Sequence, residues 1–230
     1  MKHDVEKFIF IITYGRSGST VLTRILNLIK NSDIKGENYN TLYYIYKSIQ
    51  AAEKSYSLSS NSTQSNLHAW YGVNKINVFL YKKNIINNFI ENIISPSKGA
   101  RVIGFKEIRY FEIFNSSKKD LEEYLEFIKK EFNNSYLIFN VRNPEEVVNS
   151  SWWKKSDPKI LKPKIEKFNA WAREYSHRNK CPIINYNDII DPELRMDIIK
   201  RLFEYLNEDA PSDKTVKDLL LKKSKYDLLK

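Results

Sequence analysis

The chain has 230 residues, of which 42% are hydrophobic and 13% aromatic, and its formal net charge is +10 at pH 7. This length suits one large α/β domain, and the charge favours anionic partners (nucleotides, nucleic acid, acidic membranes or anionic glycans) without choosing among them. The single cysteine, Cys181, excludes an internal disulfide and a cysteine-based metal site, and the three histidines are too scattered to indicate a metal.

None of the apolar stretches approaches the ~20 residues that a membrane-spanning helix needs. The run at 8–12 is short, has an acidic residue just upstream and leads directly into the glycine-rich loop, so it does not have the form of a signal-peptide core. We therefore expect a soluble, cytoplasmic protein without a membrane span, and peripheral contact with a membrane stays open.

Short apolar runs alternate with amphipathic segments along the chain. Buried strands are predicted at 7–13, 33–35, 101–106, 135–141 and 182–186. Helical spacing predicts helices at 20–30, 41–52, 74–94, 118–132, 160–176 and about 191–207, and a helical, basic tail follows. Because the strands are apolar throughout, we expect a mostly parallel sheet with helices on both faces, which is a three-layer α/β domain.

The loop after the first strand has the composition of an anion-binding turn. Gly15 and Gly18 allow positive φ, and successive backbone N–H groups at a helix start attract anions. Aligned on Gly18, the pattern GxxxxGK[ST] would need lysine where Ser19 stands, and the cation is Arg16 instead. The loop therefore suits a phosphate-like group without the magnesium–triphosphate apparatus, although a turn that binds nothing is the alternative. Its candidate binding residues are Gly15, Arg16, Ser17, Gly18, Ser19 and Thr20.

A second candidate anion site follows the run at 135–141. Arg142 leaves the strand end, and the segment Asn143–Glu146 has the composition of a helix start. Ser150 lies six residues past Pro144, about 1.7 helical turns on, so Arg142 and Ser150 form a reasonable pair for a second phosphate. The alternative is a surface ion pair for Arg142 and a solvent-facing Ser150.

The loop GRSGST and the segment RNPEEVVNSSWW, in this order and about 120 residues apart, resemble the sulfotransferases that use 3′-phosphoadenosine-5′-phosphosulfate. The stretches GFKEIRY at 104–110, INYNDIIDPE at 184–193 and RLFEYLN at 201–207 resemble further parts of that family. The resemblance implies a P-loop-like sulfotransferase fold that needs no metal. It also implies that the first loop binds the 5′-phosphosulfate and that Arg142 and Ser150 bind the 3′-phosphate. The product of the donor would be adenosine 3′,5′-bisphosphate.

The same resemblance implies transfer of a sulfuryl group to an acceptor hydroxyl or amine, with a carbohydrate or glycolipid as the first expectation and small aromatic alcohols as the second. Many steroid- and phenol-directed relatives use the histidine of a K-x-H stretch as the base, and Ile108 occupies that place after Lys106. Carbohydrate-directed relatives use a glutamate after the second strand, so Glu37 is the expected base and Glu107 the reserve. Arg16 would stabilise the leaving oxygen, and Lys106 would assist it or orient the acceptor, unless it is simply a solvent-exposed lysine.

We expect one sulfotransferase domain over 1–230, with 38–100 as a helical insertion that binds the acceptor. Its many tyrosines suit stacking on sugars or phenols, and several are expected in the core instead. Trp152 and Trp153 would stack on adenine or a sugar, or pack in the core.

The alternatives to a sulfotransferase are a P-loop kinase or NTPase and a non-catalytic nucleotide-binding module. A nucleic-acid-binding protein is disfavoured because the basic residues are distributed rather than clustered.

Overall fold

The structure is a computed structural model and describes residues 5–221. The chain divides into two compact units. The first, here called the sheet unit, holds the described residues up to Glu37 and from Ser97 onward. The second, the hairpin unit, is Asn38–Pro96.

The sheet unit is built on five parallel strands in the order β2-β3-β1-β4-β5. This arrangement confirms the predicted three-layer α/β fold with a parallel sheet. All five strands therefore direct their carboxyl ends to one edge, which is where ligands bind in open α/β sheets. The strands are β1 (Lys7–Ile12), β2 (Ser32–Lys35), β3 (Val102–Glu107), β4 (Ser135–Val141) and β5 (Ile183–Asn185).

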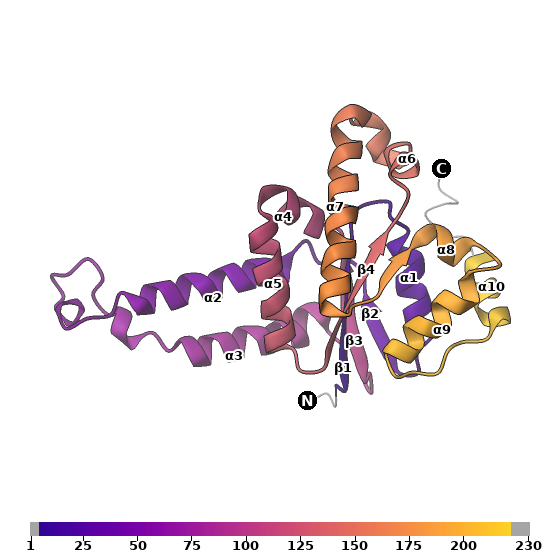
Figure 1. The fold of residues 1–230 in the computed structure, drawn as a ribbon. Helices are drawn as coiled ribbons and strands as arrows, with labels where there is room; N and C mark the ends of the chain where they lie inside the picture. Colours follow the sequence, from indigo (N-terminus) through magenta and orange to yellow (C-terminus); the bar gives the residue numbers. More distant parts are fainter. Residues whose placement is uncertain (1–4, 222–230) are drawn as a thin grey trace. The chain divides into compact units, whose positions relative to one another are not determined.

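Helices cover both faces of the sheet (Figure 1), and the two faces differ in chemistry. Ile9 and Ile11 of β1 join an aliphatic cluster with α1, α8, α9 and α10. Phe10, between them on the other face, packs edge-on against Phe105 of β3 at 5.3 Å, in an aromatic layer that continues into α4 and α7. The helices of this unit are α1 (Ser19–Leu26), α4 (Tyr110–Ser116), α5 (Lys118–Glu131), α6 (Pro144–Val148), α7 (Pro158–Asn179), α8 (Tyr186–Ile190), α9 (Arg195–Tyr205) and α10 (Asp213–Leu221).

Several element boundaries differ from the sequence prediction, and a capping side chain accounts for one of them. The last strand stops at Asn185, whose side chain accepts a hydrogen bond from the backbone N–H of Asn187 at 3.3 Å and starts the short helix α8. The helix expected from about residue 191 begins at Arg195. Of the basic tail at 221–229, only the first residue lies within the described part of the chain.

The hairpin unit contains two long helices joined by a loop (Figure 1). Helix α2 (Thr41–Ser57) runs five residues past its predicted end, and α3 (Val78–Asn88) starts where Asn77 accepts a hydrogen bond from the N–H of Leu80 at 2.9 Å. A π-helical turn at Phe89–Ile94 continues α3. The loop between them contains the 3-10 turns Ser62–Gln64 and Val73–Lys75. None of the described helices is long and apolar enough to cross a membrane.

Candidate functional site

The residues singled out in the sequence lie in a row along the carboxyl edge of the sheet. Glu37 follows β2, Lys106 and Glu107 end β3, the glycine loop follows β1, and Arg142 follows β4. Because the strand order is β2-β3-β1-β4-β5, the glycine loop is central in this row. The row has two parts, one around the glycine loop and Arg142, and one around Glu37.

Buried hydrogen bonds hold the glycine loop against strand β4. The hydroxyl groups of Thr13 and Ser17 are 2.6 Å apart and both residues are fully buried. Thr13 also donates to the backbone carbonyl of Asn140 at 2.8 Å, which ties the loop to β4. These contacts hold the base of the loop against the sheet, and a loop that is held in this way costs less to order when a ligand binds.

The start of helix α1 has the backbone geometry of an anion site. Gly18 is its N-cap residue, with φ of 81° in the left-handed region, and it offers no side chain to the first N–H groups of the helix. Arg16 also has positive φ, at 68°. The sequence of strand, glycine loop and helix matches that of a P-loop, and the N–H groups and helix dipole favour a negatively charged group there.

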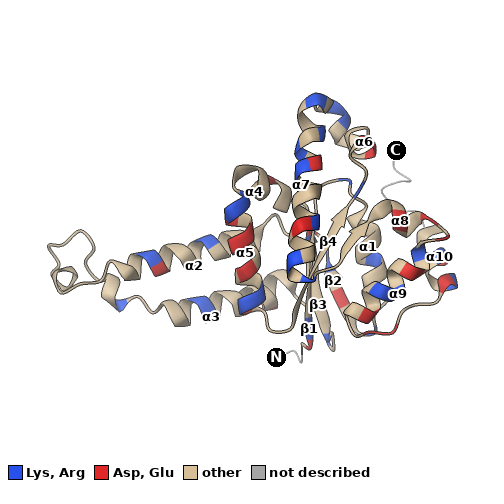
Figure 2. Cartoon of the chain, in the orientation of Figure 1, with Lys and Arg blue, Asp and Glu red and all other residues tan. Residues whose placement is uncertain are grey.

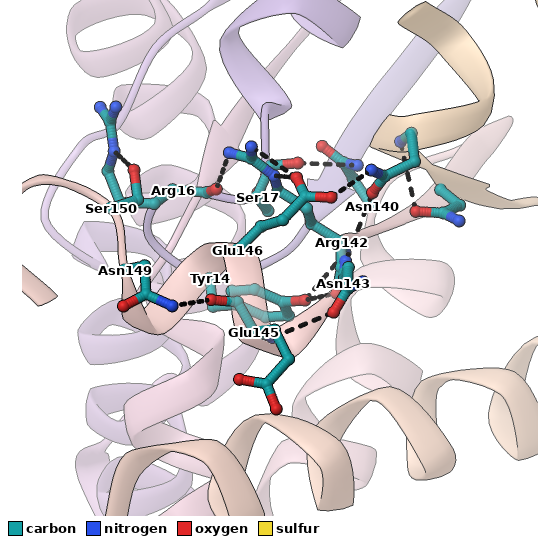
Figure 3. A network of polar contacts seen from close by, with 12 residues as sticks. Tyr14, Arg16, Ser17, Asn140, Arg142, Asn143, Glu145, Glu146, Asn149 and Ser150 are labelled. Carbon is teal, nitrogen blue, oxygen red and sulfur yellow. Dashed lines mark hydrogen bonds and ion pairs between the residues drawn. The ribbon is translucent and has the colours of Figure 1, made fainter. Parts of the chain in front are cut away.

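The two segments that the sequence analysis treated as separate sites are hydrogen-bonded to each other (Figure 3). Arg16 donates from Nε to the hydroxyl of Ser150 at 3.0 Å. Arg142 donates from Nη1 to the backbone carbonyl of Arg16 at 3.2 Å. Ser150 has an extended backbone because α6 ends at Val148, so the expected continuous helix from Pro144 to Ser150 does not form.

Arg142 already has an acidic partner within the protein. Its Nε and Nη2 lie 2.9 and 2.7 Å from Oε2 of Glu146, one helical turn along α6 (Figure 3). The hydrogen bonds from Arg142 lower the pKa of the Glu146 carboxyl against a smaller opposing effect of burial, and Asn187 adds a further hydrogen bond. The guanidinium also lies 4.7 Å from the ring centre of Tyr186. The ion pair expected as the alternative for Arg142 is therefore present.

Tyr14 fixes the backbone on which Arg142 stands. Its hydroxyl donates to the carbonyl of Arg142 at 3.1 Å and accepts from the N–H of the same residue at 2.9 Å. Burial raises the pKa of Tyr14 to about 12, despite the hydrogen bond with Arg142. The phenol therefore stays neutral at physiological pH and can hold both of these hydrogen bonds.

The two tryptophans after Ser150 differ in role. Trp153 donates from Nε1 to the carbonyl of Gly15 at 2.9 Å and packs against Phe111, so it supports the loop from the protein side. Trp152 is half exposed, and its ring centre is 5.5 Å from the guanidinium carbon of Arg16. Of the two rings, Trp152 therefore presents the larger surface to solvent.

The second part of the row is a charged cluster around Glu37. Lys106 Nζ is 2.5 Å from Oε1 of Glu37, and Arg109 Nη1 is 3.6 Å from Oε2. The side chain of Glu37 is 34% exposed and that of Lys106 is 12% exposed. Both carboxylate oxygens thus have a cationic neighbour, and Lys106 is not a simple solvent-exposed lysine.

Glu107, the reserve candidate for the base, has a different environment. Its side chain is 1% exposed, and Oε1 accepts hydrogen bonds from the backbone N–H groups of Ile108 and Arg109 at 2.9 and 3.1 Å. Arg109 Nη1 approaches the same oxygen at 3.4 Å. A carboxylate enclosed in this way is suited to holding Arg109 and the turn after β3.

Sequence reasoning did not identify Glu146 or Tyr186 as parts of the site. Glu146 was assigned only to the acidic first turn of a helix, and the spacing of four residues from Arg142 is the signal that could have paired them. The position of Tyr186 over Gly18 depends on the tertiary fold: a Cβ on Gly18 would lie 1.9 Å from Cδ2 of Tyr186. Within the described residues, no group of His, Cys, Asp and Glu is placed to hold a metal ion.

Comparisons with known proteins give one family match. The model of the sulfotransferase family matches residues 9–193, which includes both parts of the row. No curated protein matches the sequence. Among solved structures, thymidylate kinase from Candida albicans is similar at 14% identity and a TM-score of 0.39, over 77% of this chain and 82% of that one. Shikimate kinase from Bacteroides thetaiotaomicron is similar at 12% identity and a TM-score of 0.35, over 87% of this chain and 98% of that one.

Proposed function

Because the chain belongs to the sulfotransferase family, we propose that it transfers a sulfuryl group from 3′-phosphoadenosine-5′-phosphosulfate to a hydroxyl group of a carbohydrate or glycolipid. The observation that supports this proposal most directly is the hydrogen-bonded connection between Arg16, Ser150 and Arg142. It places the two segments that resemble donor-binding motifs at one point, beside the N-terminus of α1.

The residues around the glycine loop fit a donor with two anionic groups. In this proposal the backbone N–H groups of 17–20 and the guanidinium of Arg16 bind the 5′-phosphosulfate, with the hydroxyls of Ser19 and Thr20 as further donors. Arg142 and Ser150 bind the 3′-phosphate. Gly18 is required by the turn itself, because its φ is positive and a Cβ there would lie 1.9 Å from Cδ2 of Tyr186. The donor, when bound, supplies the activated sulfuryl group.

Glu37 and Lys106 have complementary tasks in the proposed reaction. Glu37 takes the proton of the acceptor hydroxyl, and Oε2 is the better placed oxygen because Lys106 lies against Oε1. Lys106 and Arg16 offer positive charge where negative charge develops on the departing oxygen. Glu107 is assigned the positioning of Arg109. The acceptor itself is assigned to 38–100, whose tyrosines offer rings for stacking on sugars.

Donor binding is tested by thermal unfolding with added nucleotides. We expect adenosine 3′,5′-bisphosphate to raise the melting temperature more than ATP with magnesium does, since the chain lacks the loop lysine of a triphosphate site. Arg142→Ala and Ser150→Ala should each reduce the shift. Arg178→Ala removes a half-exposed arginine of α7 and is the matched control. A shift that is equal for both nucleotides, or equally reduced in the control, would contradict the assignment.

The catalytic assignment is tested separately by sulfuryl transfer from labelled donor to a panel of glycan acceptors. Glu37→Gln should abolish turnover while the melting shift with adenosine 3′,5′-bisphosphate persists. Glu112→Gln, which neutralises an exposed carboxylate close to Arg109, is the control and should keep its turnover. Near-normal turnover in Glu37→Gln would remove Glu37 as the base.

A further inference from the structure

The hairpin unit carries most of the large hydrophobic side chains that are exposed in the described residues. The most exposed of them is Leu67, at 92%, in the loop between α2 and α3. Trp70 and Tyr71 in the same loop are about half exposed, and Phe79 at the start of α3 is 73% exposed. Leu67, Trp70 and Tyr71 are here called the hydrophobic tip. Clusters of this kind mark surfaces that meet a protein or a lipid.

The hydrophobic tip belongs to a defined turn. Gly72 donates its N–H to the carbonyl of Thr63 at 3.2 Å, which closes the base of the loop. Thr63 is buried and its hydroxyl donates to the carbonyl of Ser60 at 2.7 Å, while Val73 is also buried. The loop therefore buries small and medium side chains at its base and leaves the large ones of the tip exposed.

The charge of the same region has one sign. No aspartate or glutamate occurs between Lys54 and Ile90, although the chain contains 28 acidic residues. Lysines 54, 75, 82 and 83 lie in this stretch, and Figure 2 shows blue without red along α3. Lys75 and Lys83 are exposed. A surface of this kind repels basic partners and attracts anionic ones.

We propose that the hydrophobic tip docks on an anionic lipid surface. Tryptophan and tyrosine prefer the headgroup region of a bilayer because their rings are apolar and carry one polar group. Leucine inserts beside them, and the neighbouring lysines meet lipid phosphates, each adding to the attraction. A nucleic acid would need a more concentrated group of cations, and it would not engage an isolated leucine. This inference does not depend on the proposed sulfotransferase reaction.

The full-length protein is tested by co-sedimentation with phosphatidylcholine vesicles, with and without phosphatidylglycerol. We expect binding to the anionic vesicles that weakens as salt is added, and about tenfold weaker binding to neutral vesicles. Leu67→Ser with Trp70→Ser should reduce binding to anionic vesicles at least tenfold. Lys75→Glu with Lys83→Glu should do the same. The emission of Trp70 should shift to shorter wavelength on binding, and Trp70→Phe should remove that shift.

Two control pairs match these changes on the sheet unit. Ile160→Ser with Leu194→Ser removes two exposed hydrophobic side chains, and Lys164→Glu with Lys167→Glu makes the same change in net charge. Both pairs should keep their vesicle binding, and circular dichroism melts should show that all variants are folded. The proposal fails if the wild-type protein ignores anionic vesicles, if control and tip variants lose binding equally, or if the tip variants change self-association alone.

Discussion

Replacing Gly18 by alanine should damage both the stability of the protein and the proposed anion site. The new Cβ would lie 1.9 Å from Cδ2 of Tyr186, and 2.4 and 2.5 Å from the ring atoms beside it. Ordinary contact begins near 3.4 Å, so the ring must retreat by about 1.5 Å. The ring also lies against the guanidinium of Arg142, so the movement reaches the second candidate anion-binding segment.

The expected loss of stability in Gly18→Ala has two sources, and each can be measured separately. The φ of 81° at Gly18 costs a non-glycine residue about 1–2 kcal/mol. Displacing the partly exposed Tyr186 ring adds about 1 kcal/mol, the low end of what overpacking costs. We therefore expect Gly18→Ala to lower the free energy of unfolding by about 2–3 kcal/mol, measured by urea denaturation.

Two other glycines separate these sources. Gly72 has φ of 86° with open space around its Cβ position, so Gly72→Ala should show the backbone cost alone. Gly36 has neither positive φ nor a near neighbour, so Gly36→Ala should be close to neutral. The reasoning is refuted if Gly18→Ala is no more destabilising than Gly72→Ala. Titration with adenosine 3′,5′-bisphosphate should show weakened binding for Gly18→Ala only.

Three further predictions concern other contacts. Glu146→Gln removes a negative charge beside Arg142 and should tighten adenosine 3′,5′-bisphosphate several-fold in calorimetric titration, with no gain for adenosine 5′-phosphosulfate, which lacks the 3′-phosphate. Burial opposes ionisation of Glu208, but its hydrogen bond with Arg101 holds the pKa of the carboxyl below the ordinary value. The ionised carboxylate therefore stabilises the folded protein fully above about pH 4.5, and this contribution is lost as the pH falls further. Urea denaturation from pH 3 to 7 should show that dependence flattened in Glu208→Gln, with about 2 kcal/mol lost at pH 7, as expected for hydrogen bonds to a charged group. Gly104→Ala would place Cβ 1.8 Å from a backbone carbonyl of β1 and should prevent the sheet from forming, seen as loss of the circular dichroism melt.

The layers of the fold were predictable because local patterns determine them. Each apolar run is short and lies between turn residues, and this identifies a buried strand whatever its neighbours are. The same runs do not indicate on which face of the sheet each side chain lies. Ile9 and Phe10 are equally apolar, so nothing in the pattern assigns one to the aliphatic cluster and the other to the aromatic layer. That assignment depends on which helices return to each face.

The candidate site was predictable where a single segment forms it. The glycine loop combines glycines, hydroxyls and Arg16 within one turn between a strand and a helix, so its chemistry is visible locally. The end of α6 at Val148 was missed because the spacing from Pro144 to Ser150 was counted in helical turns, although Asn149, Ser150 and Ser151 are residues that favour helix ends. Tyr186 was missed because its contact with Gly18 joins segments from opposite ends of the chain.

Composition was a poor guide to the site for an electrostatic reason. The net charge of +10 suggests open basic pockets, but each cation of the row has an oxygen of the protein as a neighbour. Arg16 donates to Ser150, Arg142 to Glu146, and Lys106 to Glu37. A ligand phosphate at such a site gains only the difference between its own contacts and those it replaces. These internal partners hold the cations in place. If the proposed donor binds here, it must compete with those partners at Arg16 and at Arg142 together, which would favour a ligand with two anionic groups over one with a single group.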